Sequence, residues 1–208
     1  MVKEGARTIL DVGCGAGALA VDLKNKLNAE VFWGIEYNPE AAGIAQERLD
    51  NVISGKVEDA ISELPDNYFD RIIFADVLEH LVDPYNVLAM IRAKLKADGE
   101  LIASIPNVRH WSVVKQLLEG RWDYKEFGII DSTHLRFFTR QSMLEMFDNA
   151  GYSIINLFCN VGEMQGLTSD IITPMKKANI NVDTLEEESK HFQYIIKAVP
   201  KHKEMSFQ

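Results

Sequence analysis

Short runs of apolar, β-branched residues alternate along the chain with amphipathic stretches of helical spacing. Such runs predict buried strands at residues 7–13, 30–37, 51–57, 69–77 and 99–106. Stretches with the apolar spacing of a helix lie between them, at residues 18–27, 39–49 and 84–95. Strands that alternate with helices are typical of a parallel sheet with helices on both faces, so we expect an α/β fold.

Local signals mark where several of these helices begin and end. Asn38 and Asp83 each place a capping side chain directly before a proline, which favours a helix start. Gly99 lies where the third helix is expected to stop. A further helix is predicted from Thr139, a capping residue, to a stop signal at Gly151.

The last part of the chain departs from this alternation. Two more strands are predicted at residues 153–161 and 192–199, and a polar, partly helical insertion at 162–191 lies between them. The chain shows no repeat, low-complexity tract or linker. Its 208 residues are within reach of one ordinary domain, so we expect a single domain over residues 1–208.

Composition and charge exclude several functional classes. The chain is 47% hydrophobic and 25% charged, as globular proteins are, and its net charge of −9 argues against broad binding to nucleic acid or membranes. Cys14 and Cys159 form no disulfide framework and no metal-type cluster, so we predict no metal site and a reducing, cytoplasmic location. No apolar run approaches the ~20 residues of a membrane span, and the N-terminus lacks the apolar region of a signal peptide.

A glycine-rich turn follows the first predicted strand. In "DVGCGAG", Asp11 precedes Gly13, Gly15 and Gly17, which alternate with small residues. A glycine turn between a strand and a helix lets backbone N–H groups face a ligand, which favours a nucleotide-like cofactor. Alone it is weak evidence, because a tight turn also uses glycine for its geometry, and Cys14 fits there as a small residue.

Two later carboxylates support a cofactor site. Glu36 ends the second predicted strand, about 20 residues after the turn, where a carboxylate can accept hydrogen bonds from ribose hydroxyls. NAD proteins and methyltransferases both use this device, so it indicates a ribose without naming the cofactor. Asp59 follows the third strand, where a carboxylate can accept a hydrogen bond from the adenine amino group.

With "FADVLEHL" after the fourth strand, the motifs resemble those of class I, Rossmann-like S-adenosylmethionine-dependent methyltransferases, in the small-molecule branch that carries an LEH motif. The resemblance covers nearly the whole chain. It implies a three-layer, doubly wound, mostly parallel seven-stranded sheet of order 3-2-1-4-5-7-6 that ends in an antiparallel hairpin. It also implies S-adenosyl-L-methionine as cofactor and S-adenosyl-L-homocysteine as product.

The resemblance further implies which residues hold this cofactor. Asp11 and the glycine turn would lie at the amino-acid half, Glu36 at the ribose, and Asp59 with the two residues before it at the adenine, with Tyr37 packed on the base. The full predicted set is Asp11, Gly13, Cys14, Gly15, Gly17, Glu36, Tyr37, Val57, Glu58, Asp59, Ala75 and Asp76.

The acceptor side is predicted from histidines and from one unusual segment. His80, His110 and His134 are candidate bases for an acceptor hydroxyl, and the alternative for each is a polar residue that bonds nearby backbone. Residues 107–140 follow the fifth strand, lean basic in an acidic chain and are rich in aromatic side chains. We predict a lid-like segment that contacts a partly apolar, anionic acceptor through His110, Trp111, Arg136 and Phe137. The alternative is a packed cap whose arginines pair with its own carboxylates.

The predicted function is methyl transfer to a small-molecule acceptor that is anionic or similar to a sugar or lipid. Oxygen is favoured over nitrogen, because "ADVLE" replaces the N/D-P-P-Y/F motif of many nitrogen methyltransferases. The alternatives are a cofactor-binding partner protein without acceptor chemistry and, less favoured because no Y-x-x-x-K pair is present, an NAD(P)-dependent oxidoreductase. Family members usually carry a helix before the first strand, so we expect either that the insertion supplies the lid or that the chain is an excerpt of a longer protein.

Overall fold

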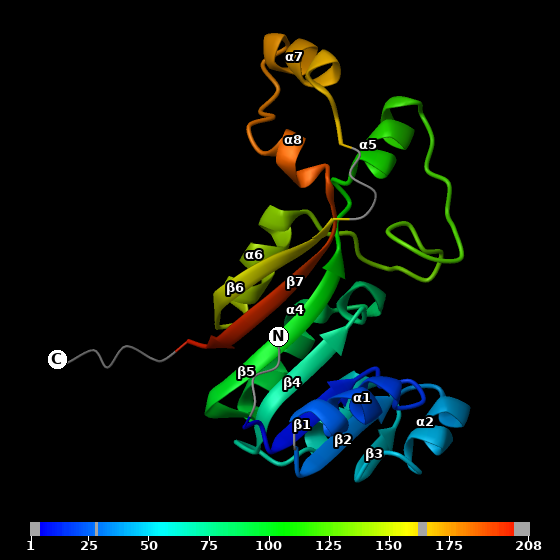
Figure 1. The fold of residues 1–208 in the computed structure, drawn as a ribbon, viewed down its shortest axis with the longest axis vertical. Coiled ribbons are helices and arrows are strands. Elements are labelled where there is room, and N and C mark those ends of the chain that lie inside the picture. The colour runs from blue at the N-terminus through cyan, green and yellow to red at the C-terminus, as the bar shows by residue number, and fades with distance from the viewer. Residues whose placement is uncertain (1–4, 28, 162–165, 202–208) are drawn as a thin grey trace, which may run out of the picture.

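A computed structural model describes residues 5–27, 29–161 and 166–201 and contains one seven-stranded sheet of order β3-β2-β1-β4-β5-β7-β6 (Figure 1). All neighbours pair in parallel except β7, which is antiparallel to both β5 and β6. The predicted sheet order and C-terminal hairpin are therefore confirmed. The strands are β1 Thr8–Val12, β2 Val31–Glu36, β3 Asn51–Ser54, β4 Phe69–Ala75, β5 Leu95–Pro106, β6 Tyr152–Val161 and β7 His191–Pro200.

The helices begin where the capping signals predict. The Asn38 side chain accepts hydrogen bonds from two backbone N–H groups of α2, Asp83 caps α4, and Thr139 forms a capping box with Ser142 of α6. The helices are α1 Ala18–Leu27, α2 Pro39–Ala45, α3 Val57–Ala60, α4 Pro84–Ile91, α5 Trp111–Leu118, α6 Arg140–Asn149, α7 Ser169–Lys177 and α8 Leu185–Glu188.

Each face of the sheet has its own apolar core. On one face, residues of α4 and α6 such as Leu88 and Phe147 pack against Phe74 and Tyr194 of the sheet. On the other face, Ala20 of α1 packs against the β1–β2 side of the sheet. Figure 1 shows α4 and α6 behind the strands and α1 in front of them, so the doubly wound arrangement is confirmed.

One expectation about local structure is wrong, and one helix was not predicted. Helix α4 ends at Ile91, and Gly99, expected to stop it, lies inside β5. A Cβ at Gly99 would lie 2.9 Å from the carbonyl oxygen of Phe69, so close strand packing explains this glycine. The lid-like segment 107–140 contains helix α5, which the sequence analysis did not predict and whose N-terminus is capped by the His110 side chain.

The polar insertion forms a small apolar cluster of its own. It is partly helical as predicted, and its residues 162–165 lie outside the described part of the chain. Leu167, Ile172, Val182 and Leu185 bury their side chains together, with Trp111 of α5 packed against them. Figure 1 places α7 and α8 beyond the end of the sheet, beside α5. Among the described residues, every helix is too short or too polar to cross a membrane.

Gly34, in the middle of β2, should tolerate no side chain. Its Cβ would lie 2.5 Å from the Cys14 sulfur and 3.0 Å from Leu49, so Gly34→Ala should destabilise the fold by about 1–3 kcal/mol through overpacking. Gly43 of α2 has open space at the same position, so Gly43→Ala should stabilise by about 0.5–1 kcal/mol. Urea unfolding of both variants measures the difference, and equal effects would contradict the packing of Cys14 against β2.

Candidate functional site

The glycine turn after β1 leaves open space beside its backbone. Gly13, Gly15 and Gly17 have φ angles of +72°, +52° and +79°, which glycine adopts at little cost. A Cβ at Gly13 would lie 2.6 Å from Val77, so this glycine lets two turns pack together. A Cβ at Gly15 would have no atom within 4 Å, so a ligand can approach the backbone there.

Two buried carboxyl groups lie behind this turn. Glu36, at the end of β2, accepts hydrogen bonds from the N–H groups of Gly15 at 2.8 Å and Asn38 at 2.9 Å. Each carboxylate oxygen retains a further lone pair, so these bonds are compatible with the predicted contact to a ribose. Burial, and secondarily the charge of Glu36, raises the pKa of Asp11 to about 7.

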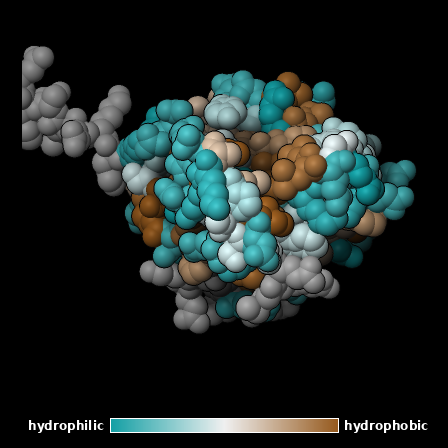
Figure 2. Space-filling view, turned by 90° about the horizontal axis from the view of Figure 1, so that it is seen from above, coloured by the Kyte–Doolittle hydropathy of each residue, from teal (hydrophilic) through white to brown (hydrophobic). Residues whose placement is uncertain are grey.

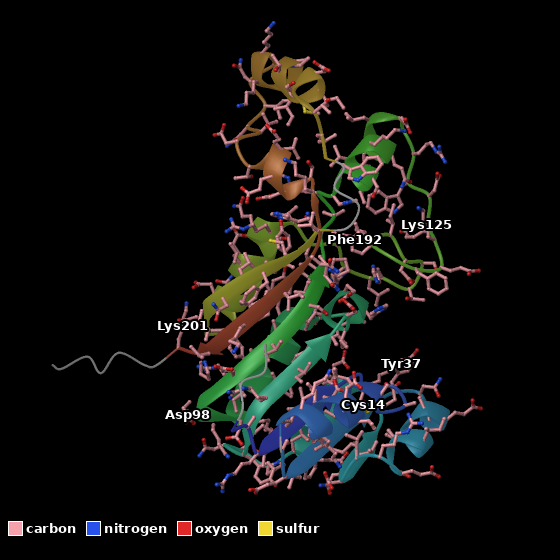
Figure 3. The ribbon with its side chains drawn as sticks, in the orientation of Figure 1. Cys14, Tyr37, Asp98, Lys125, Phe192 and Lys201 are labelled. Carbon is pink, nitrogen blue, oxygen red and sulfur yellow. The ribbon has the colours of Figure 1, made fainter. Side chains whose placement is uncertain are left out.

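The other predicted cofactor residues lie around the same strand ends. Tyr37 is 75% exposed at the rim of the site, while Cys14 is buried below the turn (Figure 3). Burial raises the pKa of the Cys14 thiol to about 12, so this side chain acts as a small packing group. Val57 is buried, and Asp59 is exposed in the first turn of α3. The cofactor roles of these residues stay predictions.

Asp76 connects the ends of three strands. Its φ angle is +55°, unusual for a residue other than glycine, and Ala75 before it ends β4. Its carboxylate accepts a hydrogen bond at 3.0 Å from Ser104 of β5 and another from the side chain of Gln193 in β7. A strained backbone held by side-chain bonds at a strand end is common at functional sites.

The segment after β5 is bound to the turn that follows β4. The carbonyl oxygen of Glu79, in the 3-10 turn Leu78–His80, accepts hydrogen bonds from the N–H groups of Leu135 at 2.8 Å and Arg136 at 3.0 Å. The guanidinium of Arg136 donates to the carbonyl oxygens of Val82 and Leu135. These contacts bring His134 to His80, with their ring centroids 4.7 Å apart.

Hydrogen-bond partners set the tautomers of these two histidines. Nδ1 of His134 lies 3.1 Å from the carbonyl oxygen of Ile129, and Nδ1 of His80 lies 3.3 Å from that of Thr133. A carbonyl oxygen only accepts, so each Nδ1 carries the proton of a neutral ring, and each Nε2 offers a lone pair. Burial lowers the pKa of His134, which favours its neutral form.

Glu79 is a site residue that the sequence analysis missed. Its side chain is 1% exposed, and neither carboxyl oxygen has a hydrogen-bond partner among the described residues. Burial raises its pKa to about 8, with smaller contributions from Asp76 and Asp131. The sequence signal that could have identified Glu79 was the LEH motif, in which Glu79 directly precedes His80 after the fourth strand.

Glu79, His80 and His134 each place one possible ligand atom within 4.8 Å of the others, although the sequence predicted no metal site. Burial favours the protonated form of Glu79 when no ion is bound, whereas a metal ion would require its deprotonated form. The cluster places three side chains that can exchange protons together at the end of β4.

His110 differs from the other two histidines. Its Nδ1 accepts a hydrogen bond from the N–H of Ser112 at 3.4 Å and lies 2.8 Å from the Ser112 hydroxyl, which can donate to the same nitrogen. Its Nε2 is buried without a partner among the described residues. Burial lowers the pKa of His110, so the neutral ring carries its proton on Nε2. This geometry favours a hydrogen-bond donor over the predicted base.

The predicted acceptor residues divide between two apolar clusters. Phe137 packs edge-to-face against Trp122 at 5.1 Å and lies 6.2 Å from the ring of His134. Trp111 faces α7, where it lines a cavity of about 650 Å³ with Leu118, Leu167 and Ile171. The molecule seen from above, the end that carries α5 and α7, shows apolar side chains between hydrophilic flanks (Figure 2). Trp111 and Phe137 therefore belong to different parts of the lid-like segment.

Several basic side chains of this segment are already paired. Arg109 lies 2.6 Å from Glu188, and Lys115 and Arg121 form ion pairs with Glu119 and Asp123. For Lys115 and Arg121 the structure agrees with the alternative of a cap that pairs its own charges, whereas the partner of Arg109 belongs to α8 in the insertion. Arg136, which donates to backbone carbonyls, remains exposed beside His134.

The two buried carboxyl groups should make stability fall as pH rises. In the unfolded chain they ionise near their ordinary pKa of about 4, whereas the native protein holds these protons to about 7 on Asp11 and about 8 on Glu79. Between pH 6.5 and 8 the native state therefore binds more protons, so the free energy of unfolding should fall by up to about 1.4 kcal/mol per pH unit for each group.

Glu79→Gln should remove the Glu79 part of this slope, and Asp11→Asn the Asp11 part. Urea unfolding of the three proteins between pH 6.5 and 8 measures it. His110 and His134 contribute equally to the slope of all three proteins, so differences between the slopes report the two carboxyl groups. Identical slopes for all three proteins would show that neither carboxyl group holds its proton in the native state.

Comparisons with known proteins agree with this architecture. Residues 2–157 match the family model described as a methyltransferase domain. A ubiquinone biosynthesis O-methyltransferase of Xanthomonas euvesicatoria is 32% identical over 165 residues, which are 71% of this chain and 66% of the relative. The mitochondrial enzyme of that name from Schizosaccharomyces pombe is 33% identical over 105 residues, 47% of this chain and 37% of the relative. The chain thus spans just under two thirds of the length of the Xanthomonas relative.

Solved structures share the fold at low sequence identity. A SAM-dependent methyltransferase from Archaeoglobus fulgidus superposes with a TM-score of 0.68 at 19% identity and covers 94% of this chain and 87% of its own. A possible histamine N-methyltransferase from Thermotoga maritima gives 0.64 at 19% identity over 97% of this chain and 84% of its own. The family model covers the glycine turn, the LEH turn and the lid-like segment, and the chain belongs to this methyltransferase domain family.

Proposed function

We propose that this chain transfers a methyl group from S-adenosyl-L-methionine to a hydroxyl oxygen of a small-molecule acceptor. The observation that carries the choice of oxygen is the pair His80 and His134, which offer Nε2 lone pairs at the end of β4, beside the turn that contacts Gly13. A hydroxyl loses its proton as it is methylated, and neutral imidazole suits that step at physiological pH. The curated relatives named O-methyltransferases support the same choice.

The described residues fit the cofactor. The open space at Gly15 accommodates a ligand against the backbone. Glu36 at the end of β2 and Asp59 in α3, the helix after β3, are the carboxylates proposed for ribose and adenine. When bound, the sulfonium supplies an electrophilic methyl group that carries its own driving force. The protein must then align the acceptor, exclude water and accept one proton.

The acceptor is proposed to lie between the glycine turn and the lid-like segment. Phe137 and His134 would line its apolar side, and the buried Nε2–H of His110 would donate to an acceptor oxygen. Arg136 is the basic side chain beside the histidines that is not ion-paired within the described residues, so it would meet an acceptor carboxylate or phosphate.

Titration calorimetry with S-adenosylhomocysteine and with NAD tests the cofactor. Binding of S-adenosylhomocysteine alone supports the proposal, and binding of NAD alone would overturn it. Labelled S-adenosylmethionine incubated with phenols, sugars and their phosphates then tests the acceptor. Transfer to amines but not to hydroxyls would contradict the assignment to oxygen.

Gly15→Ala should weaken binding of S-adenosylhomocysteine more than tenfold, about 1.4 kcal/mol, because the new methyl group fills the ligand's space. Gly120→Ala is the matched control. Gly120 also has a positive φ, +73°, and open space around a Cβ, but it follows α5, away from the turn. Both variants should lose similar stability, and only Gly15→Ala should lose affinity in calorimetry. Equal affinities would place the cofactor elsewhere.

A further inference from the structure

A chain of hydrogen bonds leads from the ring of His80 to a carboxylate. Nδ1 of His80 lies 3.2 Å from the hydroxyl oxygen of Thr133, and that hydroxyl donates to Asp131 at 2.7 Å. A threonine hydroxyl has a single proton, which is committed to Asp131. Its oxygen therefore accepts from the Nδ1–H of His80, which leaves Nε2 of His80 as the basic atom.

The loop that carries this chain is fixed in place. The N–H of Thr133 also donates to Asp131 at 2.7 Å, and the next residues are bonded to the carbonyl oxygen of Glu79. Asp131 and His80 are thus held together although they are far apart in sequence. A base that is itself oriented by a further hydrogen-bonding group is a recurring arrangement in sites that activate a hydroxyl.

We propose that His80 is the catalytic base of this site, and that Thr133 and Asp131 are positioning residues that fix its tautomer and stabilise its protonated form. The proposal rests on the proposed transfer to a hydroxyl oxygen. As the acceptor oxygen forms its bond to the methyl carbon, its proton passes to Nε2 of His80, and the electron pair of the broken carbon–sulfur bond stays on sulfur. The imidazolium then releases its proton to water.

His80 is a better candidate than His134 for two reasons. His80 is exposed, so an acceptor can reach its ring, whereas His134 is buried. The Nδ1 partner of His134 is a neutral carbonyl, without a hydroxyl and carboxylate behind it. The other ionisable groups near the two rings are Glu79, Asp76 and Asp131, so a positive charge formed on His80 meets carboxyl groups.

Two acceptors of different acidity test the base. Catechol must lose its proton during transfer, whereas 4-nitrocatechol is largely ionised at neutral pH and needs no base. His80→Gln should reduce turnover of catechol by ~100-fold or more and that of 4-nitrocatechol by less than about fivefold. Calorimetry should show unchanged affinity for S-adenosylhomocysteine. Equal losses on both acceptors would mean that His80 is structural and would overturn the proposal.

Substitution of the two positioning residues should reduce turnover less than substitution of His80, and a conservative variant should restore it. Thr133→Val and Asp131→Asn should each reduce catechol turnover by about tenfold with little effect on 4-nitrocatechol, and Thr133→Ser should restore it. Ser132→Ala, an exposed neighbour in the same loop, is the control and should behave as the unmodified protein. Loss of both activities in Thr133→Val without rescue by serine would contradict the orienting role.

Nitrogen-15 NMR of the histidine rings gives a readout that needs no acceptor. The Nδ1–H tautomer is expected for His80, and Thr133→Val should lower its population. Because this measurement is independent of turnover, it tests the orientation of His80 by Thr133 even if neither catechol is methylated and the proposed function fails. An Nε2–H tautomer at His80 would overturn it. Activity lost after dialysis against EDTA and restored by Mg²⁺ would also overturn it, since the cluster would then act through a cation.

Discussion

Two hydrogen bonds to the carbonyl oxygen of Glu79 hold the acceptor side of this molecule together. The N–H groups of Leu135 and Arg136 bind the same oxygen, so the segment after β5 is fixed to the turn after β4. This attachment places His134 and Thr133 beside the ring of His80. A main-chain contact thus determines which side chains of two distant segments become neighbours, whereas the sheet provides only the edge on which they meet.

The buried carboxyl groups lie where a stable fold would avoid them. Glu79 has no hydrogen-bond partner among the described residues, and Asp11 lies close to the carboxylate of Glu36. In both places the surroundings disfavour the negative charge that an exposed carboxyl group would have at neutral pH. Both occur at the carboxyl ends of β1 and β4, next to the turns proposed to bind ligands. Sites that violate the general pattern of burial in this way are expected where function, rather than stability, maintains the residues.

Apolar runs in the sequence located the strands, because buried parallel strands are continuous apolar runs, and capping residues marked helix starts locally. The order of the strands in the sheet followed from the family resemblance. The sequence analysis misplaced Gly99, since a glycine that ends a helix and one that admits a close strand look alike in sequence. It missed α5, whose cap is a histidine rather than serine, threonine or aspartate. The contact between Thr133 and His80 could not be predicted from the sequence either, because it forms only when two segments more than fifty residues apart in sequence pack together.

The three histidines show why residue type alone could not assign the chemistry. Each occurs near a strand end, and each was an equal candidate for a base. His110 accepts a hydrogen bond from the N–H of Ser112, so its proton is held on Nε2, and the ring can only donate toward a ligand. His80 and His134 donate to oxygen atoms, so their outer nitrogens carry lone pairs. The division between donor and base therefore arises from the group that each Nδ1 faces. His110 and His134 find that partner within their own segment, whereas His80 meets Thr133 because the lid-like segment docks on Glu79.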